Sequence, residues 1–443
     1  MILNFQFKNW ACYRDEVCLS MQAGPERDIV GHLPRFGSPS RPEKVLPIAA
    51  VYGGNASGKT QLVKAIRFLQ QFVLGAFPKG VLPHTPFLLD EKDIDTPTEF
   101  TIQFLSGDTV YEYGVIMGRT KILSEELSYF SARGAKKVPL FIRKDRVEVL
   151  SIKWGTPAFQ AYARELTISD TQPFLSLSYD LCSDSEHVKT VYGWFADRLF
   201  VISPDMHYLG VEDFCSEGRL LDVTLDYLKR FDTGINSFEP RRVDPSSLPP
   251  IVLEDLSNKV RAGTNVRAQV GNGDILMVTR LETGALEVRK LFAAHKTAGN
   301  GVVPFSMDRE SDGTRRMLDL IPAFARLRAQ DSNAVYVIDE IDRSLHYLVS
   351  RAFISEYLES CRHDSRSQLI FTTHDLLLMD QGLLRRDEMY IVDKSPDGVS
   401  SLVDLRQFRG LRKDTDVRAR YLEGRFGGIV RNLRLVQSLH VGK

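Results

Sequence analysis

Ten residues decide how this chain folds: Val51-Tyr52-Gly53-Gly54-Asn55-Ala56-Ser57-Gly58-Lys59-Thr60. They fit the phosphate-loop pattern G-x-x-x-x-G-K-S/T at every fixed position. The apolar run from Pro47 to Tyr52 predicts a buried strand before the loop, and apolar residues at helical spacing predict a helix after it. An ordinary glycine turn before a helix is the alternative, but strand, loop and helix in this order favour a phosphate site.

The chemistry of such a loop follows from its backbone. Glycines let the N–H groups from Gly53 to Gly58 turn inward around a phosphate chain, and the helix N-terminus adds partial positive charge. The side chain of Lys59 would reach the β- and γ-phosphates, and the Thr60 hydroxyl would hold Mg²⁺. The stretch therefore predicts a site for ATP with Mg²⁺.

Two later stretches predict more of the same site. Ala334–Glu340 is an apolar run that ends in two acids, which predicts a buried strand. After a phosphate loop, Asp339 is expected to hold Mg²⁺, and Glu340 is expected to be the base that orients the attacking water. Gln368–Asp375 predicts another buried strand, and His374 near its end is expected to contact the γ-phosphate or that water. By itself, each run is also compatible with a plain strand that ends in a polar residue.

A third stretch, Glu310–Arg316, opens a helical pattern in which Ser311 is a candidate N-cap. A capped helix is the simplest interpretation of this stretch alone. It stands just before the acid strand, however, where ABC-type ATPases carry the signature motif that contacts the γ-phosphate bound to the opposite subunit. Ser311 and Gly313 are therefore candidate phosphate contacts.

Composition places the chain among ordinary globular proteins, because 43% of its 443 residues are hydrophobic and 26% are charged. Lys+Arg and Asp+Glu both number 57, so the overall charge does not indicate nucleic acid or a membrane as a partner. The segment from Arg406 to Lys443 differs, since ten Lys/Arg against three Asp/Glu give it a net charge of +7. Such a segment is usually a solvated surface, and nucleic-acid contact is the other interpretation.

Three features predict a cytoplasmic protein without membrane contact. No apolar run approaches the length of a membrane span. The start of the chain lacks the basic and apolar regions of a signal peptide. The five cysteines are scattered, without C-x-x-C pairs, which indicates a reducing compartment and no zinc site.

Periodicity divides the chain into three parts. Residues 1–155 are expected to form an N-terminal ATPase lobe, in which the phosphate loop stands beside an antiparallel β subdomain. Residues 156–250 predict a helical insertion that ends in a proline-rich linker at 239–250. Residues 251–443 are expected to form the C-terminal lobe with Ser311, the two acids and His374. With the motifs above, which resemble those of ABC-type ATPases, this division predicts an α/β fold class: an ABC-type P-loop NTPase core with an antiparallel β subdomain and a helical insertion.

The order phosphate loop, S-D-G-T, V-I-D-E and T-T-H, together with a predicted N-terminal hairpin, resembles the SMC/OLD-like branch of ABC ATPases. Within that branch the chain is most similar to the bacterial RloA/AbiLi-type defence ATPases, a group of AAA family ATP-binding proteins. The similarity covers most of the chain and includes Asp339–His346, Leu384–Glu388 and Tyr421–Gly428. It implies the roles given above for the phosphate loop and the two acids, a switch histidine at His374, and a signature that acts in trans.

The chain departs from the pattern of these relatives at several places. The signature reads S-D-G-T rather than L-S-G-G-Q, and Leu345-His346 stands where many relatives have Leu-Asp. Gln103 is the candidate for the Q-loop glutamine. The insertion is too short for an SMC arm. No acidic cluster after His374 resembles the Toprim nuclease of OLD proteins, so no nuclease activity of its own is expected.

The resemblance implies an ATPase that forms a homodimer, or a higher oligomer, around ATP and acts as a switch in anti-phage defence by abortive infection. It would hold or release a separate effector encoded nearby, such as an RloB-like nuclease. The alternative is a DNA repair or recombination ATPase whose main ligand is DNA, and a metabolic or regulatory ATPase is a third interpretation. A toxin or nuclease gene beside this one would favour defence, and a recombination gene would favour repair.

Overall fold

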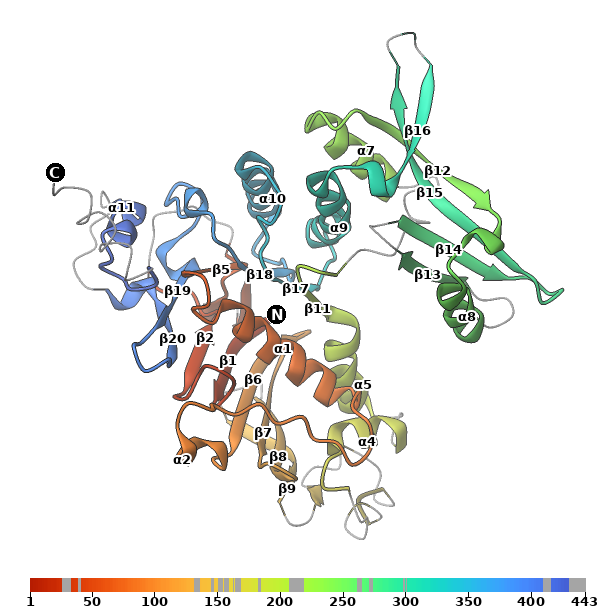
Figure 1. Ribbon diagram of the computed structural model, residues 1–443. Helices are drawn as coiled ribbons and strands as arrows, with labels where there is room; N and C mark the ends of the chain where they lie inside the picture. The colour runs from red at the N-terminus through yellow and green to blue at the C-terminus, as the bar shows by residue number, and fades with distance from the viewer. Residues whose placement is uncertain are drawn as a thin grey trace. The chain divides into compact units, whose positions relative to one another are not determined.

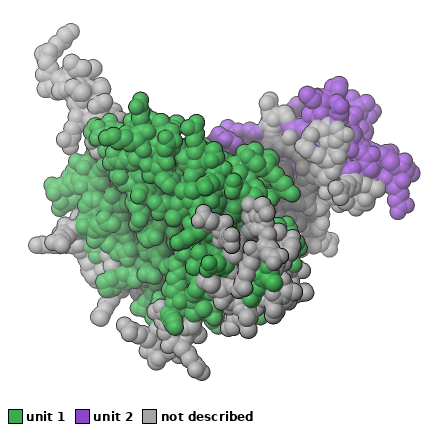
Figure 2. Space-filling model, turned by 90° about the horizontal axis from the view of Figure 1, so that it is seen from below, with its two compact units in different colours: residues 1–204, 327–341, 354–443 green, residues 205–326, 342–353 purple. Residues whose placement is uncertain are grey.

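The computed structural model in Figure 1 divides into two compact units, which are coloured in Figure 2. Unit 1 comprises residues 1–204, 327–341 and 354–443, and unit 2 comprises residues 205–326 and 342–353. The residues that the structure describes are 1–25, 33–38, 41–130, 136–144, 147–149, 154, 159–161, 163, 169–181, 185–206, 219–260, 265–270, 274–297, 299, 301–408 and 416–429.

A six-stranded sheet forms the first layer of unit 1. Its strands, in spatial order, are β11 (Leu199–Ile202), β17 (Val335–Ile338), β18 (Gln368–Thr372), β5 (Ile48–Tyr52), β19 (Met389–Lys394) and β20 (Ser400–Asp404). All neighbours pair in parallel except β19 and β20, which are antiparallel. Every residue of β5, β17 and β18 is buried, which explains why these strands are continuous apolar runs rather than alternating ones.

A seven-stranded antiparallel sheet forms the second layer of unit 1. Its strands, in spatial order, are β10 (Val147–Val149), β9 (Lys137–Arg143), β8 (Ile122–Phe130), β7 (Thr109–Met117), β6 (Thr98–Ser106), β1 (Ile2–Lys8) and β2 (Val17–Ser20). The predicted N-terminal hairpin is present as β1–β2, and β6 and β7 form a second hairpin in the expected antiparallel subdomain. A separate two-stranded sheet joins β3 (Arg35–Ser38) to β4 (Arg41–Lys44). The predicted α/β class, with an antiparallel subdomain beside the phosphate-loop core, is confirmed.

Helix α1 (Lys59–Val73) belongs to the same hydrophobic core as both sheets of unit 1. The ring of Phe68 lies 4.9 Å from that of Trp10 and 5.5 Å from that of Phe100 on β6. Among the described residues, unit 1 also contains the α-helices α2 (Glu91–Ile94), α4 (Phe174–Leu181), α5 (Glu186–Gly193) with a π-helical turn (Trp194–Arg198), and α11 (Val417–Leu422). Within the described residues, no helix has the length and apolar character needed to cross a membrane.

Unit 2 contains its own antiparallel sheet. In spatial order its strands are β12 (Ile235–Val243), β15 (Leu286–Lys296), β14 (Asp274–Arg280) and β13 (Asn265–Val270), and β16 (Val302–Ser306) pairs with β15. Helix α8 (Pro250–Lys259) packs Leu256 into a small core with Leu276, Val278 and Val288. Helix α7 (Arg219–Arg230) also lies in unit 2, as does α9 (Asp312–Leu327) except for its last residue. Helix α10 (Tyr347–Ser360) begins in unit 2 and ends in unit 1.

Two local predictions are wrong. Leu199 was expected within a helical stretch, but Leu199–Ile202 forms β11, which pairs with β17. The proline-rich stretch 239–250 was expected to be a linker, but β12 continues to Val243. Pro240 is compatible with this strand because β12 is the edge of its sheet among the described strands, where a missing N–H costs little. The division of the chain at residues 155 and 250 stays a prediction.

A buried carboxylate connects the antiparallel sheet to α4. Glu125, on β8, accepts hydrogen bonds from the backbone N–H groups of Phe174 and Leu175, at 2.7 and 3.1 Å, and from the Tyr113 hydroxyl at 3.0 Å. The guanidinium of Arg143 lies 3.5 Å away. Burial raises the pKa of the Glu125 carboxyl, and Arg143 and the two amides oppose that rise.

We expect Glu125→Ala to lower the free energy of unfolding by about 3–5 kcal/mol, because it leaves a buried guanidinium and three donors without this acceptor. Urea-induced unfolding measures the change. Glu126→Ala is the matched control, since the side chain of Glu126 is 41% exposed and pairs with Lys137 at the surface. The Glu126→Ala substitution should lower the free energy of unfolding by less than about 1 kcal/mol. Equal losses in the two variants would contradict the structural role of Glu125.

Candidate nucleotide site

The predicted site residues of unit 1 lie at the carboxyl ends of three adjacent parallel strands. The phosphate loop follows β5, Asp339 and Glu340 follow β17, and His374 follows β18. The sheet register pairs Val51 with Thr372 and Ile338 with Phe371, so the three strands end at the same level. In open parallel sheets this edge is where ligands bind.

Lys59 occupies the centre of the phosphate loop. Its ammonium group is buried and donates hydrogen bonds to the carbonyl oxygens of Gly53 and Gly54, at 2.7 and 3.1 Å. It also lies 3.4 Å from Nδ1 of His374. Thr60 follows in the first turn of α1, while Asn55 and Ala56 are exposed at the tip of the loop.

Two other parts of unit 1 hold the loop from outside. The Ser400 hydroxyl on β20 donates to the Ser57 carbonyl oxygen at 2.5 Å, and the Tyr13 hydroxyl donates to the Gly58 carbonyl oxygen at 3.0 Å. Gly58 has a φ of +123°, and a Cβ there would lie 2.9 Å from both Cys12 Sγ and Ser400 Oγ. Only glycine fits this position, because both the backbone conformation and the surrounding atoms exclude a side chain.

The acid pair is held by the neighbouring strand. Asp339 is buried, and its Oδ1 accepts a hydrogen bond from the Thr372 hydroxyl at 2.6 Å. Glu340 has a φ of +50°, which is unusual for a residue other than glycine and is typical of functional sites. Its side chain is 34% exposed, and Oε1 lies 3.8 Å from Nε2 of His374.

His374 therefore stands between the lysine of the loop and the second acid. An ammonium group can only donate, so Nδ1 accepts the hydrogen bond from Lys59, which places the proton of a neutral imidazole on Nε2. That proton faces the Glu340 carboxylate. The structure thus brings Lys59, Glu340 and His374 together, although His374 lies 315 residues after Lys59 in the chain.

Ser311 and Gly313 lie in unit 2, at the start of α9. The Ser311 hydroxyl accepts a hydrogen bond from the Thr314 N–H at 3.1 Å, which confirms the predicted N-cap contact. A Cβ on Gly313 would lie 2.7 Å from the Ser344 carbonyl oxygen, so this turn is packed tightly. His346 accepts a hydrogen bond from the Leu348 N–H at the start of α10.

The residues present fit ATP and Mg²⁺. Ser57 Oγ is buried inside the loop and has no hydrogen-bond partner among the described residues, so it offers a hydroxyl that a phosphate oxygen would satisfy. The Thr60 hydroxyl and the Asp339 carboxylate are oxygen ligands of the kind that Mg²⁺ prefers. No group of three or more His, Cys, Asp or Glu among the described residues could hold a metal ion alone. A magnesium ion held partly by phosphates needs fewer protein ligands than that.

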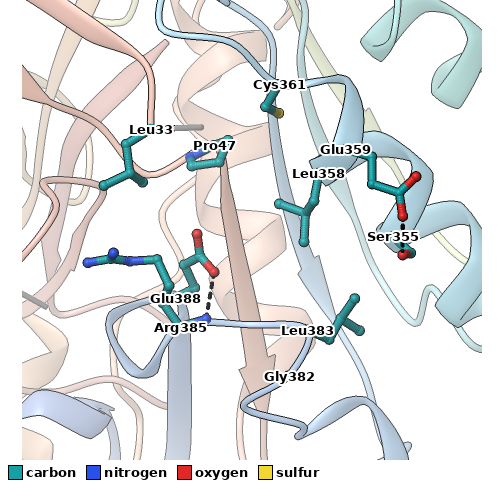
Figure 3. A pocket seen from close by; sticks show the side chains of 10 residues that line it. All are labelled: Leu33, Pro47, Ser355, Leu358, Glu359, Cys361, Gly382, Leu383, Arg385 and Glu388. Atoms are coloured by element: carbon teal, nitrogen blue, oxygen red, sulfur yellow. Dashed lines mark hydrogen bonds between the residues drawn. The ribbon is translucent and has the colours of Figure 1, made fainter. Parts of the chain in front are cut away.

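A pocket at the opposite end of the strands does not belong to this site (Figure 3). It has a volume of about 220 Å³, and its lining includes Pro47, which precedes β5, and Glu388, which precedes β19. The nearby motif Leu384–Glu388 is structural, because Arg385 and Asp387 form a buried bidentate pair and Glu388 accepts from the Arg385 N–H. This pairing explains the motif without a role at the nucleotide.

Sequence reasoning missed Tyr13 and Ser400, because hydroxyl residues inside strands and turns carry no motif of their own. It gave no role to Thr372, although this residue belongs to the T-T-H stretch. The candidate Q-loop residue is wrong, since Gln103 lies within β6 and its amide binds Asn4 and Glu112. The basic segment from Arg406 to Lys443 lies largely outside the described residues, which omit 409–415 and 430–443.

A family model described as "AAA domain, putative AbiEii toxin, Type IV TA system" matches residues 48–155 and 205–380. These ranges include the phosphate loop, Ser311, the acid pair and His374. No curated protein matches the chain.

Two solved structures are similar to the chain at low sequence identity. One is the SMC head domain from Thermotoga maritima, with 12% identity and a TM-score of 0.37, covering 91% of this chain and 98% of that one. The other is an SMC head bound to the C-winged helix domain of ScpA, with 15% identity and a TM-score of 0.37, covering 91% and 97%. Because the family model matches more than half of the residues, the chain belongs to this family of AAA-domain proteins.

Proposed function

We propose that this protein binds ATP with Mg²⁺ and hydrolyses it. The observation that carries the proposal is the cluster of Lys59, Glu340 and His374 at the carboxyl ends of three parallel strands. When ATP binds, the Lys59 ammonium group would donate its hydrogen bonds to phosphate oxygens instead of to the carbonyl oxygens of the loop. Glu340 would accept a proton from the attacking water, and His374 would orient that water or the γ-phosphate. Mg²⁺ bound by Thr60 and Asp339 would offset the negative charge that develops on the phosphates.

We further propose that the complete site forms between two copies of the chain. Ser311 and Gly313 would contact the γ-phosphate bound by the partner, so the dimer interface would be isologous. The helix N-terminus at Ser311 supports this role, because such ends attract anions. ATP would then join two chains in a homodimer, and a higher oligomer is compatible with the same interface.

The biological role that we propose is a cytoplasmic switch in anti-phage defence. The description of the matching family names an AbiEii toxin of a type IV toxin–antitoxin system, which supports a place for this chain in a system of that kind. ATP binding would change the affinity for a separate effector encoded nearby, such as an RloB-like nuclease. By reciprocity, the effector would change the affinity for ATP by the same factor.

The switch model predicts slow turnover for the protein alone, near or below the low end of the usual range of about 1–1,000 s⁻¹. A switch works through the difference in effector affinity between its two states, and it does not need a high rate of ATP hydrolysis. The test is to co-purify the product of the adjacent gene and measure its binding with ATP, with ADP and with the Glu340→Gln variant. Identical effector binding in all three states would reject the switch. Strong stimulation of hydrolysis by bare DNA would favour the repair alternative, in which DNA is the main ligand.

A further inference from the structure

Thr372 makes a hydrogen bond to each of the two acids at the end of β17. Its side chain is fully buried on β18. The hydroxyl donates to Asp339 Oδ1 at 2.6 Å, and the same oxygen accepts from the backbone N–H of Glu340 at 2.8 Å. One side chain therefore contacts both the proposed Mg²⁺ ligand and the proposed general base.

The direction of these two hydrogen bonds is determined by chemistry. A backbone N–H can only donate, so the hydroxyl oxygen must accept from Glu340. Its single proton is then directed to Asp339, whose Oδ1 accepts it. The orientation of the Asp339 carboxylate is thereby linked to the position of the Glu340 backbone.

Thr372 also holds the peptide on the other side of Glu340. The backbone N–H of Ile341 donates to the Thr372 carbonyl oxygen at 3.0 Å. Thr372 thus accepts hydrogen bonds from the peptide N–H groups on both sides of the Glu340 side chain. Between these two peptides, Glu340 has a φ of +50°. A left-handed conformation at a residue other than glycine persists only where surrounding contacts impose it.

We propose that Thr372 is a positioning residue of the ATPase site, which sets the Mg²⁺-binding carboxylate and the general base in one fixed arrangement. The inference rests on the proposed function, because it assigns those roles to Asp339 and Glu340. Residues that orient metal ligands through hydrogen bonds typically change metal affinity or activity by about 10–100-fold when they are replaced.

The test compares Thr372→Val with Thr372→Ser in the full-length protein. Valine keeps the shape of threonine but removes both hydrogen bonds, whereas serine keeps the hydroxyl. We expect Thr372→Val to lower kcat by about 10–100-fold and to raise the Mg²⁺ concentration for half-maximal activity by a similar factor. Calorimetric titration with ATP, with and without Mg²⁺, should show a loss only in the Mg²⁺-dependent part of the affinity. The Thr372→Ser variant should have a kcat and a Mg²⁺ requirement close to those of the wild type.

Thr373→Val is the matched control, since Thr373 is an equally buried neighbour whose hydroxyl accepts from the Asp375 N–H and does not contact the acid pair. Its Mg²⁺ dependence should equal that of the wild type. If Thr372→Val does not fold, Thr372→Cys gives a graded variant, because a thiol is a weaker donor, and an intermediate Mg²⁺ requirement is expected.

The outcomes separate this inference from the proposed function. A wild-type protein that neither binds nor hydrolyses ATP would reject the function itself. An active wild type with an unchanged Mg²⁺ requirement in the Thr372 variants would overturn only the positioning role. Equal losses in Thr372→Val and Thr373→Val, with no shift in Mg²⁺ dependence, would also overturn it, because they would show a general effect of removing a buried hydroxyl.

Discussion

Lys59→Ala is expected to weaken ATP binding by about 100-fold or more, which corresponds to the loss of one preorganised charged donor in a buried site. The ammonium group is buried among the carbonyls of the phosphate loop and contacts His374, so it is positioned where the phosphate charge would accumulate. Isothermal titration with ATP and Mg²⁺ measures the affinity. The variant keeps the loop glycines and α1, so circular dichroism should match that of the wild type.

Lys64→Ala is the control for this prediction. Lys64 lies on the same helix, one turn later, and its side chain is exposed to solvent. Its removal changes the net charge by the same amount without touching the loop, so ATP affinity should change by less than about threefold. Unchanged affinity in Lys59→Ala would remove the assignment of the phosphate loop.

Glu340→Gln should lower turnover by about 100-fold or more, because an amide cannot accept the proton of the attacking water. ATP binding should persist, since the phosphate loop is unchanged. If the signature at Ser311 acts in trans, this variant should accumulate as an ATP-bound dimer. Size-exclusion chromatography with light scattering, with and without ATP, reports the mass. A monomer under both conditions would contradict the dimer model.

A second substitution tests the contact with the partner. Ser311→Asp, placed in the Glu340→Gln background, keeps a good N-cap for α9 but adds a negative charge beside the proposed γ-phosphate. Ser311→Asn caps the helix equally well and is neutral, so it serves as the control. We expect ATP-dependent dimers with Asn and monomers with Asp. Dimers in both variants would show that Ser311 does not face a bound phosphate.

The local parts of the site were predictable because each lies within one short stretch. The phosphate loop, the acid pair and the T-T-H strand end all follow buried apolar runs, and the structure places them after β5, β17 and β18. The prediction was wrong at Leu199–Ile202, because a run of four apolar residues is compatible with a helix as well as a strand. Only pairing with β17 makes this run a strand.

The sequence by itself determined which residues could bind phosphate and Mg²⁺, since the pattern from Gly53 to Thr60 and the acids at Asp339 and Glu340 are each contiguous. The tertiary structure decided which side chains hold those groups in place. Ser400 reaches the loop across 343 residues of sequence, and Thr372 reaches Asp339 across 33. Thr372 reaches Asp339 because the sheet order places β18 beside β17, and Ser400 lies on β20, which follows β19 beside β5 in the same sheet. No local pattern of residues encodes that strand order.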